Sequence, residues 1–141
     1  MKLAVLTLVA VLASLPARAD EFCDALKQVA GDAKGGFPNV RGAEGNVPDF
    51  YQSPSIVLPG GTCAVMTGGD EEYSCTYTLS DHWQNDFIAL RERVTACLGT
   101  QPETYGTEGS VGYAIDGQSD VVKLRKTESG LEIDVENRSG S

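Results

Sequence analysis

Residues 121–136, with the sequence VVKLRKTESGLEIDVE, decide the fold of this chain. They form two segments of alternating apolar and charged residues around the turn-forming tripeptide Glu128-Ser129-Gly130, which is the pattern of a β-hairpin with one buried face. In the register that buries the apolar side, opposite charges face each other on the solvent side, as an antiparallel pair favours. The four facing pairs are Val122–Val135, Leu124–Ile133, Lys123–Asp134 and Arg125–Glu132.

A second hairpin is predicted upstream, with strands over residues 56–67 and 73–79. Gly68-Gly69-Asp70 separates the strands and supplies strong turn chemistry. Folding the chain about this turn places Val65 opposite Tyr73. The register therefore follows from the turn and from the apolar alternation together.

The four cysteines all lie in or beside these elements, and an even number is typical of disulfides in a small exported chain. The upstream hairpin sets Cys63 directly opposite Cys75, where the Cβ atoms are close enough for a bridge. Cys23 and Cys97 then remain for a second bridge. The main alternative joins each helical cysteine to one strand of the hairpin. No C-x-x-C motif occurs, which excludes zinc ribbons and thioredoxin-type redox sites.

Two amphipathic helices are predicted, one from residue 20 or 21 to residue 33 and one over residues 82–98. Ser80 or Asp81 is expected to cap the second helix, and Gly99 to end it. Each helix has an apolar stripe at helical spacing. The stripes consist of Phe22, Leu26, Val29 and Ala33 in the first helix, and of Trp83, Phe87, Leu90, Val94 and Cys97 in the second.

These elements predict an α+β fold with an antiparallel sheet of about five strands and both helices on one face, in the order α-β-β-α-β-β-β. Residues 111–115 supply the remaining strand, before the closing hairpin. Residues 37–55 are expected to form a loop with short extended pieces near residues 38–41 and 50–52. The sheet face away from the helices should stay open to solvent or to a partner.

The first nineteen residues have the three regions of a secretory signal peptide. Lys2 is followed by an apolar run over residues 3–15, and Ala17-Arg18-Ala19 places small residues before a cut at Asp20. The run is shorter than the roughly 20 residues that a membrane-spanning helix needs. We therefore expect export to the periplasm or the extracellular space, a single domain over residues 20–141, and no membrane insertion after cleavage.

The chain is acidic, with 11 Lys and Arg against 20 Asp and Glu and a net charge of −9. Cleavage also removes Lys2 and Arg18, which lowers the net charge to −11. Such a surface excludes nucleic-acid binding and attracts a cationic protein at low salt. Asp70, Glu71 and Glu72 at the first hairpin tip are candidate residues for binding such a partner. They could alternatively hold Ca²⁺, although their spacing is not that of an EF-hand.

His82 is the only histidine, and Asp81 and Asp86 lie beside it in the sequence. A histidine oriented by a carboxylate is half of a catalytic constellation, so the alternative function is a small periplasmic hydrolase. However, helix capping explains Asp81 equally well, no thiol stays free once both bridges form, and no G-x-S-x-G motif occurs. We therefore predict no catalytic residue, no metal and no cofactor.

Three stretches are similar to those of small exported bacterial proteins of unknown function with two disulfides. They are Pro59-Gly60-Gly61-Thr62-Cys63, Tyr73-Ser74-Cys75 and the helix end Val94-Thr95-Ala96-Cys97-Leu98-Gly99. The order helix, strands, helix, strands also resembles the fold of type III secretion chaperones, which work without disulfides in the reducing cytoplasm. The resemblance implies a binding or regulatory module rather than an enzyme. The expected function is thus an acidic, non-enzymatic binding module, of the inhibitor or immunity type, that blocks a basic protein.

Overall fold

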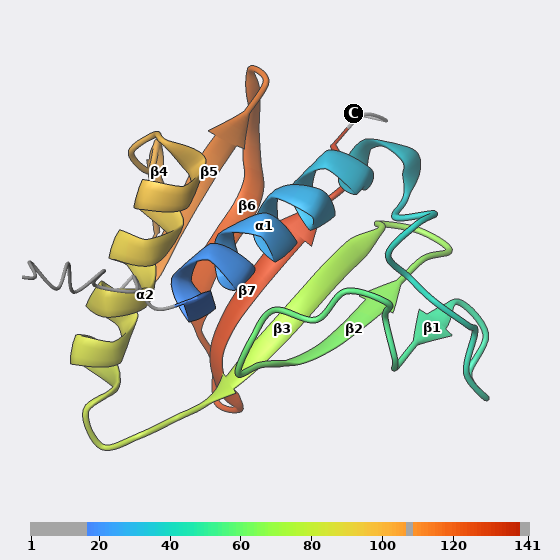
Figure 1. Cartoon of the computed structure of the whole chain (residues 1–141), viewed down its shortest axis with the longest axis horizontal. Helices are drawn as coiled ribbons and strands as arrows, with labels where there is room; N and C mark the ends of the chain where they lie inside the picture. The colour runs from blue at the N-terminus through green and yellow to red at the C-terminus, as the bar shows by residue number, and fades with distance from the viewer. Residues whose placement is uncertain (1–16, 107–108, 139–141) are drawn as a thin grey trace, which may run out of the picture.

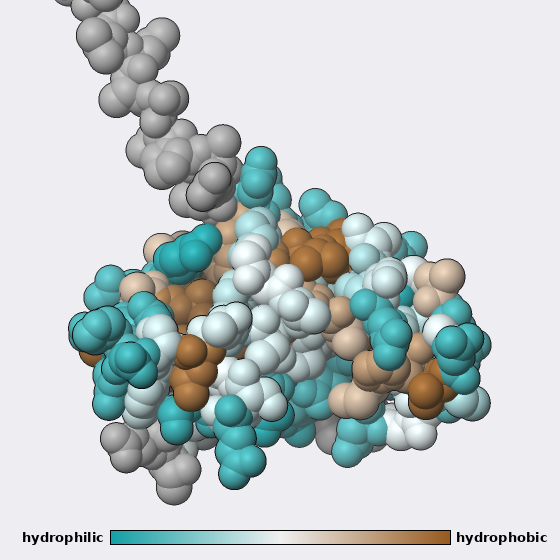
Figure 2. Space-filling view, turned by 90° about the horizontal axis from the view of Figure 1, so that it is seen from below, coloured by the Kyte–Doolittle hydropathy of each residue, from teal (hydrophilic) through white to brown (hydrophobic). Residues whose placement is uncertain are grey.

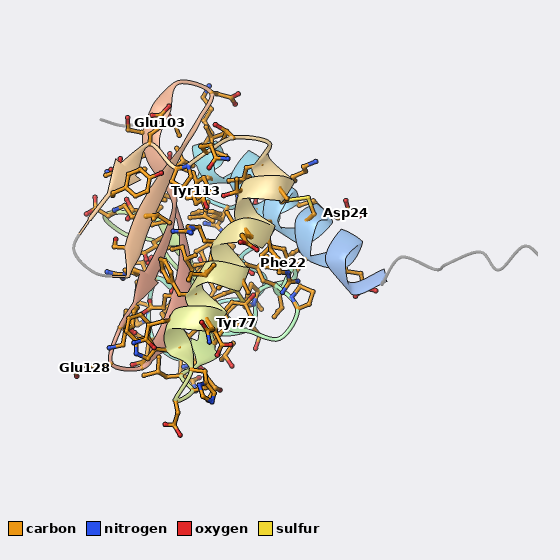
Figure 3. The ribbon with its side chains drawn as sticks, turned by 90° about the vertical axis from the view of Figure 1, so that its left-hand side faces the viewer. Phe22, Asp24, Tyr77, Glu103, Tyr113 and Glu128 are labelled. Carbon is orange, nitrogen blue, oxygen red and sulfur yellow. A yellow bond between two sulfur atoms is a disulfide. The ribbon has the colours of Figure 1, made fainter. Side chains whose placement is uncertain are left out.

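The computed structural model describes residues 17–106 and 109–138, and most of the predicted signal peptide lies outside these ranges. The described chain forms a seven-stranded antiparallel sheet in the order β1-β2-β3-β7-β6-β5-β4, together with two helices (Figure 1). A view along the sheet shows both helices on one side of it (Figure 3). The elements are α1 (Ala17–Asp32), β1 (Phe50–Tyr51), β2 (Thr62–Met66), β3 (Glu72–Thr78), α2 (Trp83–Leu98), β4 (Thr104–Tyr105), β5 (Ser110–Ile115), β6 (Gln118–Lys126) and β7 (Gly130–Glu136).

The α+β class is confirmed, but the sheet is larger than predicted. Two strands of two residues each, β1 and β4, pair along its edges and raise the number from about five to seven. The element order is accordingly α-β-β-β-α-β-β-β-β. A two-residue strand is too short to show alternation, so the pattern of residues did not predict β4 or the pairing of β1 with the sheet. The extended piece expected near residues 50–52 coincides with β1.

Both predicted registers are confirmed. Cys63 lies opposite Cys75 in the β2–β3 pair, and Val122 lies opposite Val135 in the β6–β7 pair. Strand β2 is shorter than predicted because residues 56–61 leave the sheet. The Tyr73 hydroxyl donates a hydrogen bond to the Ile56 carbonyl (2.8 Å), which holds this segment over the helix-covered side of the sheet.

The core lies between the sheet and the two helices. Apolar stripes of α1 and α2 pack against the inward residues of the central strands, and the two cation–π contacts of Arg93 with Phe22 and Lys126 with Trp83 cover its margins. Figure 3 shows Tyr113 between β5 and α2, where its hydroxyl hydrogen-bonds to Thr95. The largest fully buried side chains include Phe22, Leu26, Leu58, Tyr73, Val94, Tyr113, Leu124 and Ile133.

The helix ends differ from the prediction at their N-termini. Helix α1 already includes Ala17, the first residue that the structure describes, and therefore covers the predicted cleavage site ahead of Asp20. Helix α2 is preceded by His82 as N-cap, with no side-chain cap, so the predicted cap at Ser80 or Asp81 is wrong. The Ser80 hydroxyl instead donates to the Asp86 carboxylate (2.6 Å). The predicted end at Gly99 is confirmed by its left-handed backbone, with φ of 67°.

The two disulfides are confirmed as predicted. Cys63–Cys75 joins β2 to β3, and Cys23–Cys97 joins α1 to α2, with Cα–Cα distances of 4.1 Å and 5.3 Å. The alternative, in which each helix is bridged to the hairpin, is therefore wrong. The second bridge ties the middle of α1 to the end of α2 and so holds the helical layer together. Within the described ranges, no helix is long and apolar enough to span a membrane.

The long segment between α1 and β2 is packed rather than loose. The Asp32 carboxylate accepts hydrogen bonds from the Asn39 and Val40 amides (2.9 and 3.0 Å), which turns the chain back after the helix. Phe37, Val40 and Tyr51 are buried in the core. These contacts position β1 at the edge of the sheet.

Candidate binding face

One face of the sheet carries no helix, and we call it the open face (Figure 3). Residues along the central strands alternate between the core and this face, as strand geometry requires. In β3, for example, Tyr73 and Cys75 are buried in the core, so Glu72, Ser74 and Thr76 lie on the opposite side. The other open-face residues of the central strands are Thr62, Ala64, Met66, Lys123, Arg125, Glu132, Asp134 and Glu136.

Asp134 is the centre of a polar network on the open face. Its carboxylate accepts hydrogen bonds from the Ser74 hydroxyl (2.7 Å) and from Arg125 Nε (2.7 Å). Only 1% of Asp134 is exposed, although no helix covers it, because the neighbouring polar side chains do. Lys123 forms a further ion pair with Glu136 (2.9 Å). Together with Glu72 and Glu132, the network therefore contains four carboxylates and two cations on this surface.

The shortest ion pairs of the network run diagonally to the predicted facing pairs. The predicted register is right, but Arg125 binds Asp134 (2.7 Å) more closely than Glu132, which lies directly opposite it (3.7 Å). Likewise Lys123 lies opposite Asp134 but pairs with Glu136. Both cations reach two residues along β7, as long side chains can on a twisted pair of strands. The charged residues of this face were also expected to be exposed to solvent, whereas Asp134 is buried.

The electrostatics of the network raise the pKa of Glu72. The pKa of Glu72 is raised to about 7, chiefly by burial and also by the neighbouring carboxylates of Asp134 and Glu136, against the opposing effect of Arg125. Burial also raises the pKa of Asp134, while its hydrogen bond from Ser74 and the charge of Arg125 act in the opposite direction. Crowded carboxylates in partial burial favour the proton-bound form. Glu72 is therefore only partly ionised near neutral pH.

A groove of about 530 Å³ lies on the open face beside this network. The apolar side chains that line the groove come from β1 and β2. One of them, Met66, is 43% exposed. Ser74 belongs both to the groove and to the carboxylate network. The principal lining residues are Phe50, Thr62, Ala64, Met66, Ser74 and Thr76. An apolar groove and a group of carboxylates therefore lie side by side.

The three acidic residues predicted at the hairpin tip lie in three different surroundings. Asp70 is exposed in the turn, whereas the Glu71 carboxylate accepts a hydrogen bond from the Asn137 side chain (3.1 Å) and packs against Gly36. Glu72 lies in β3 and belongs to the open-face network. In the part of the chain that the structure describes, no three His, Cys, Asp or Glu side chains form a group suited to a metal ion.

His82 also lies apart from any reactive group. It is exposed at the start of α2, and its imidazole makes no hydrogen bond or ion pair with residues 17–106 or 109–138. Asp86, the carboxylate expected to orient it, is hydrogen-bonded to Ser80 instead. Both disulfides are formed, so no cysteine thiol is available as a nucleophile. The arrangement does not assemble a nucleophile with a base.

Comparison of the chain with known protein families, curated proteins and solved structures finds no match. The resemblance to small exported two-disulfide proteins and to secretion chaperones therefore stays a prediction.

Among the described surfaces, the view from below shows apolar residues at separate places among hydrophilic ones (Figure 2). Scattered apolar residues of this kind are ordinary on a protein surface. The open face is distinguished by having its groove and its carboxylates adjacent.

Sequence reasoning missed the most important residues of the open face. The alternation placed Asp134 away from the core, but Ser74 was not singled out and Asp134 was treated only as one half of a surface ion pair. The alternation alone places Ser74 and Asp134 on the open face, whereas only the β3–β7 pairing brings Ser74 opposite Asp134. The pairing of β3 with β7 joins residues sixty positions apart, and no local pattern predicts it.

Proposed function

We propose that the processed chain is an exported, non-enzymatic binding module whose open face binds a basic protein and blocks it, as an inhibitor or immunity-type protein does. The observation that carries the proposal is the adjacency of the Glu72–Asp134 carboxyl pair and the apolar groove on the uncovered face of the sheet. The two disulfides fit an oxidising compartment outside the cytoplasm. Export itself is part of the proposal.

The chemistry of the open face suits a lysine or arginine that stands beside an apolar side chain. The apolar side chain would enter the groove next to Met66, and the cation would lie against Glu72. A cation at that position favours the ionised form of Glu72 and so counteracts the raised pKa. Binding should therefore strengthen as the pH rises through about 7. Of the three residues Asp70, Glu71 and Glu72, Glu72 contacts the cation of the partner, and Asp70 lies at the edge of the binding surface.

The acidity of the whole chain supports the same partner. A net charge of −9 before cleavage, and −11 after it, draws in a cationic protein over a distance comparable with the Debye length. Long-range attraction raises the association rate, whereas the open face supplies the specific contacts. Affinity is consequently expected to fall with salt without disappearing, because contacts in the groove are not screened.

The test compares three processed chains immobilised in turn: the wild type, Thr76→Arg and Gln28→Arg. Thr76→Arg places a cation in the groove of the open face, and Gln28→Arg makes the same charge change on the exposed side of α1. Each is exposed to the exported proteins of the producing cells, and the captured proteins are identified by mass spectrometry. We expect one basic protein that the wild type and Gln28→Arg retain and that Thr76→Arg loses.

The affinity of the purified captured protein is then measured by calorimetry at pH 6 and at pH 8. Tighter binding at pH 8, with a smaller pH effect in Glu72→Gln, supports the assignment of Glu72. Equal capture by wild type and Thr76→Arg, capture of acidic proteins alone, or no capture would overturn the proposal. A hydrolytic activity lost in His82→Ala would favour the alternative hydrolase instead.

A further inference from the structure

A second cleft, of about 320 Å³, lies apart from the open-face groove. Its walls come from the last turns of α1, the end of α2, the β5–β6 turn and the end of β7. Figure 1 shows the C-terminal end of α1, the tip of the β5–β6 hairpin and the end of β7 at the same end of the molecule. The volume falls at the lower end of the range of about 300–1,000 Å³ that small-molecule sites occupy.

The floor of this cleft is apolar. Ala30 and Ala33 contribute from the α1 side, Leu98 from the end of α2, and Ile115 and Val121 from the hairpin. Ala33 and Val121 are buried, and the other three pack against the core. A short hydrocarbon or aromatic body placed here would remove apolar surface from water on several sides.

The walls of the cleft carry an excess of cations, in contrast to the acidic chain as a whole. Lys27, Lys34 and Arg138, three of the eleven lysines and arginines of the chain, line it. Two acids also line it, Asp116 and Glu136. Glu136 is paired with Arg138 and with Lys123 (2.9 Å), which leaves Lys27 and Lys34 as the other cations of the cleft and Asp116 as its other acid. Lys27 forms no ion pair with any residue in the described ranges, so its ammonium group can receive a ligand.

We infer that this cleft binds a small amphipathic anion, a carboxylate on a short apolar body. The carboxylate lies at Lys27 and the body lies on Ile115 and Val121. A charge-assisted contact to the Lys27 ammonium group fixes the head, and burial of the tail supplies the remaining affinity. The cleft shares Glu136 with the open-face network but shares no lining residue with the open-face groove, so either proposal can fail without the other.

The test titrates the processed chain with octanoate and follows backbone amides by heteronuclear NMR. Saturable shifts of Ala30, Ile115 and Val121 are expected with octanoate. Octylammonium, which has the same tail and the opposite charge, should leave these amides unshifted. Acetate, which has the head without the tail, should bind much more weakly. Equal shifts with octylammonium, or no saturable shift with octanoate, would overturn the inference.

Two variants locate the site. Lys27→Glu should weaken octanoate binding roughly tenfold, the effect of losing one good charged contact. Lys126→Glu is the matched control, because it makes the same charge change beside Trp83, at the opposite end of α2 and about 22 Å from Leu98 along the helix. Equal weakening by the two variants would mean a general charge effect and would refute the site.

A further variant, Ala30→Leu, fills the floor of the cleft. It should abolish octanoate binding while the circular dichroism spectrum and both disulfides stay unchanged. Octanoate binding that survives Ala30→Leu in a folded protein would place the ligand elsewhere. If Ala30→Leu does not fold, the comparison of Lys27→Glu with Lys126→Glu decides the question, because both positions lie at the surface.

Discussion

At the scale of single residues, the open face shows how a carboxylate is kept in a sheet without a helix above it. Asp134 is 1% exposed, yet it receives two hydrogen bonds, one from Ser74 and one from Arg125. A buried charge is tolerated only when it is paired and hydrogen-bonded. Glu72 lies on β3, diagonally across from Asp134 on β7. It has no equivalent ion pair among the described residues, and its pKa is raised to about 7. Burial raises the pKa of both carboxyl groups, and the partners of Asp134 oppose that shift.

The raised pKa of Glu72 predicts that the free energy of unfolding falls as the pH rises from about 5 to 8. The folded state holds a proton on Glu72 up to about pH 7, whereas the unfolded state releases it near pH 4.5, so each step of pH in this window favours unfolding. We expect a contribution of about 1–2 kcal/mol, reduced from the full linkage value because solvent reaches the half-exposed group.

Urea unfolding of the wild type and of Glu72→Gln at intervals between pH 5 and pH 8 measures this contribution. Glu72→Gln should show a flatter profile, because its side chain does not titrate. Glu92→Gln, at an exposed position on α2, is the matched control and should follow the wild type. Identical profiles for Glu72→Gln and the wild type would contradict the assignment.

At the scale of elements, helix α2 is defined more firmly at its C-terminus than at its N-terminus. Its start has His82 as N-cap with no side-chain hydrogen bond, and Ser80 binds Asp86 instead of the helix amides. Its end has Gly99 in the left-handed region, and the Gly99 amide donates to the Thr95 carbonyl (2.9 Å). The apolar stripe, rather than the N-terminal cap, therefore holds α2 against the sheet.

Two glycine substitutions separate backbone conformation from packing. Nothing lies within 4 Å of an added Cβ at either Gly99 or Gly31, so neither substitution produces a clash. Gly99→Ala should destabilise the protein by about 1 kcal/mol, since a left-handed φ strains an L residue. Gly31→Ala, within α1, should stabilise it by about 0.5–1 kcal/mol. Urea unfolding at constant pH gives both values, and effects of the same sign would refute this account.

At the scale of the whole molecule, two covalent bridges join the parts of the fold that local patterns leave independent. Cys23–Cys97 spans 74 residues and ties α1 to α2, while Cys63–Cys75 spans 12 and fastens β2 to β3. The first bridge is partly exposed between the helices, and the second is buried in the core. A long closed loop constrains the unfolded chain more than a short one does.

This difference in burial predicts the order in which the bridges are reduced in the native protein. With a water-soluble phosphine at low concentration, Cys23 and Cys97 should take up an alkylating label first, because reagent reaches them without unfolding. Cys63 and Cys75 should be labelled only as the protein unfolds. Peptide mass spectrometry measures the label at each cysteine. Labelling of any cysteine before reduction, or of Cys63 and Cys75 first, would contradict the structure.

What the sequence by itself determined is local: two helices and two hairpins with correct registers. The pairing of the four cysteines followed from one of these registers, with Cys23 and Cys97 as the remaining pair. Alternation and helical spacing act within a few residues, and the 63–75 disulfide follows directly from a hairpin register. Only the tertiary structure decided the seven-stranded sheet, the burial of Asp134 and the meeting of Lys27 with Arg138 at one cleft. These features join residues far apart in the chain, and their free energy depends on which surfaces pack together rather than on any short stretch.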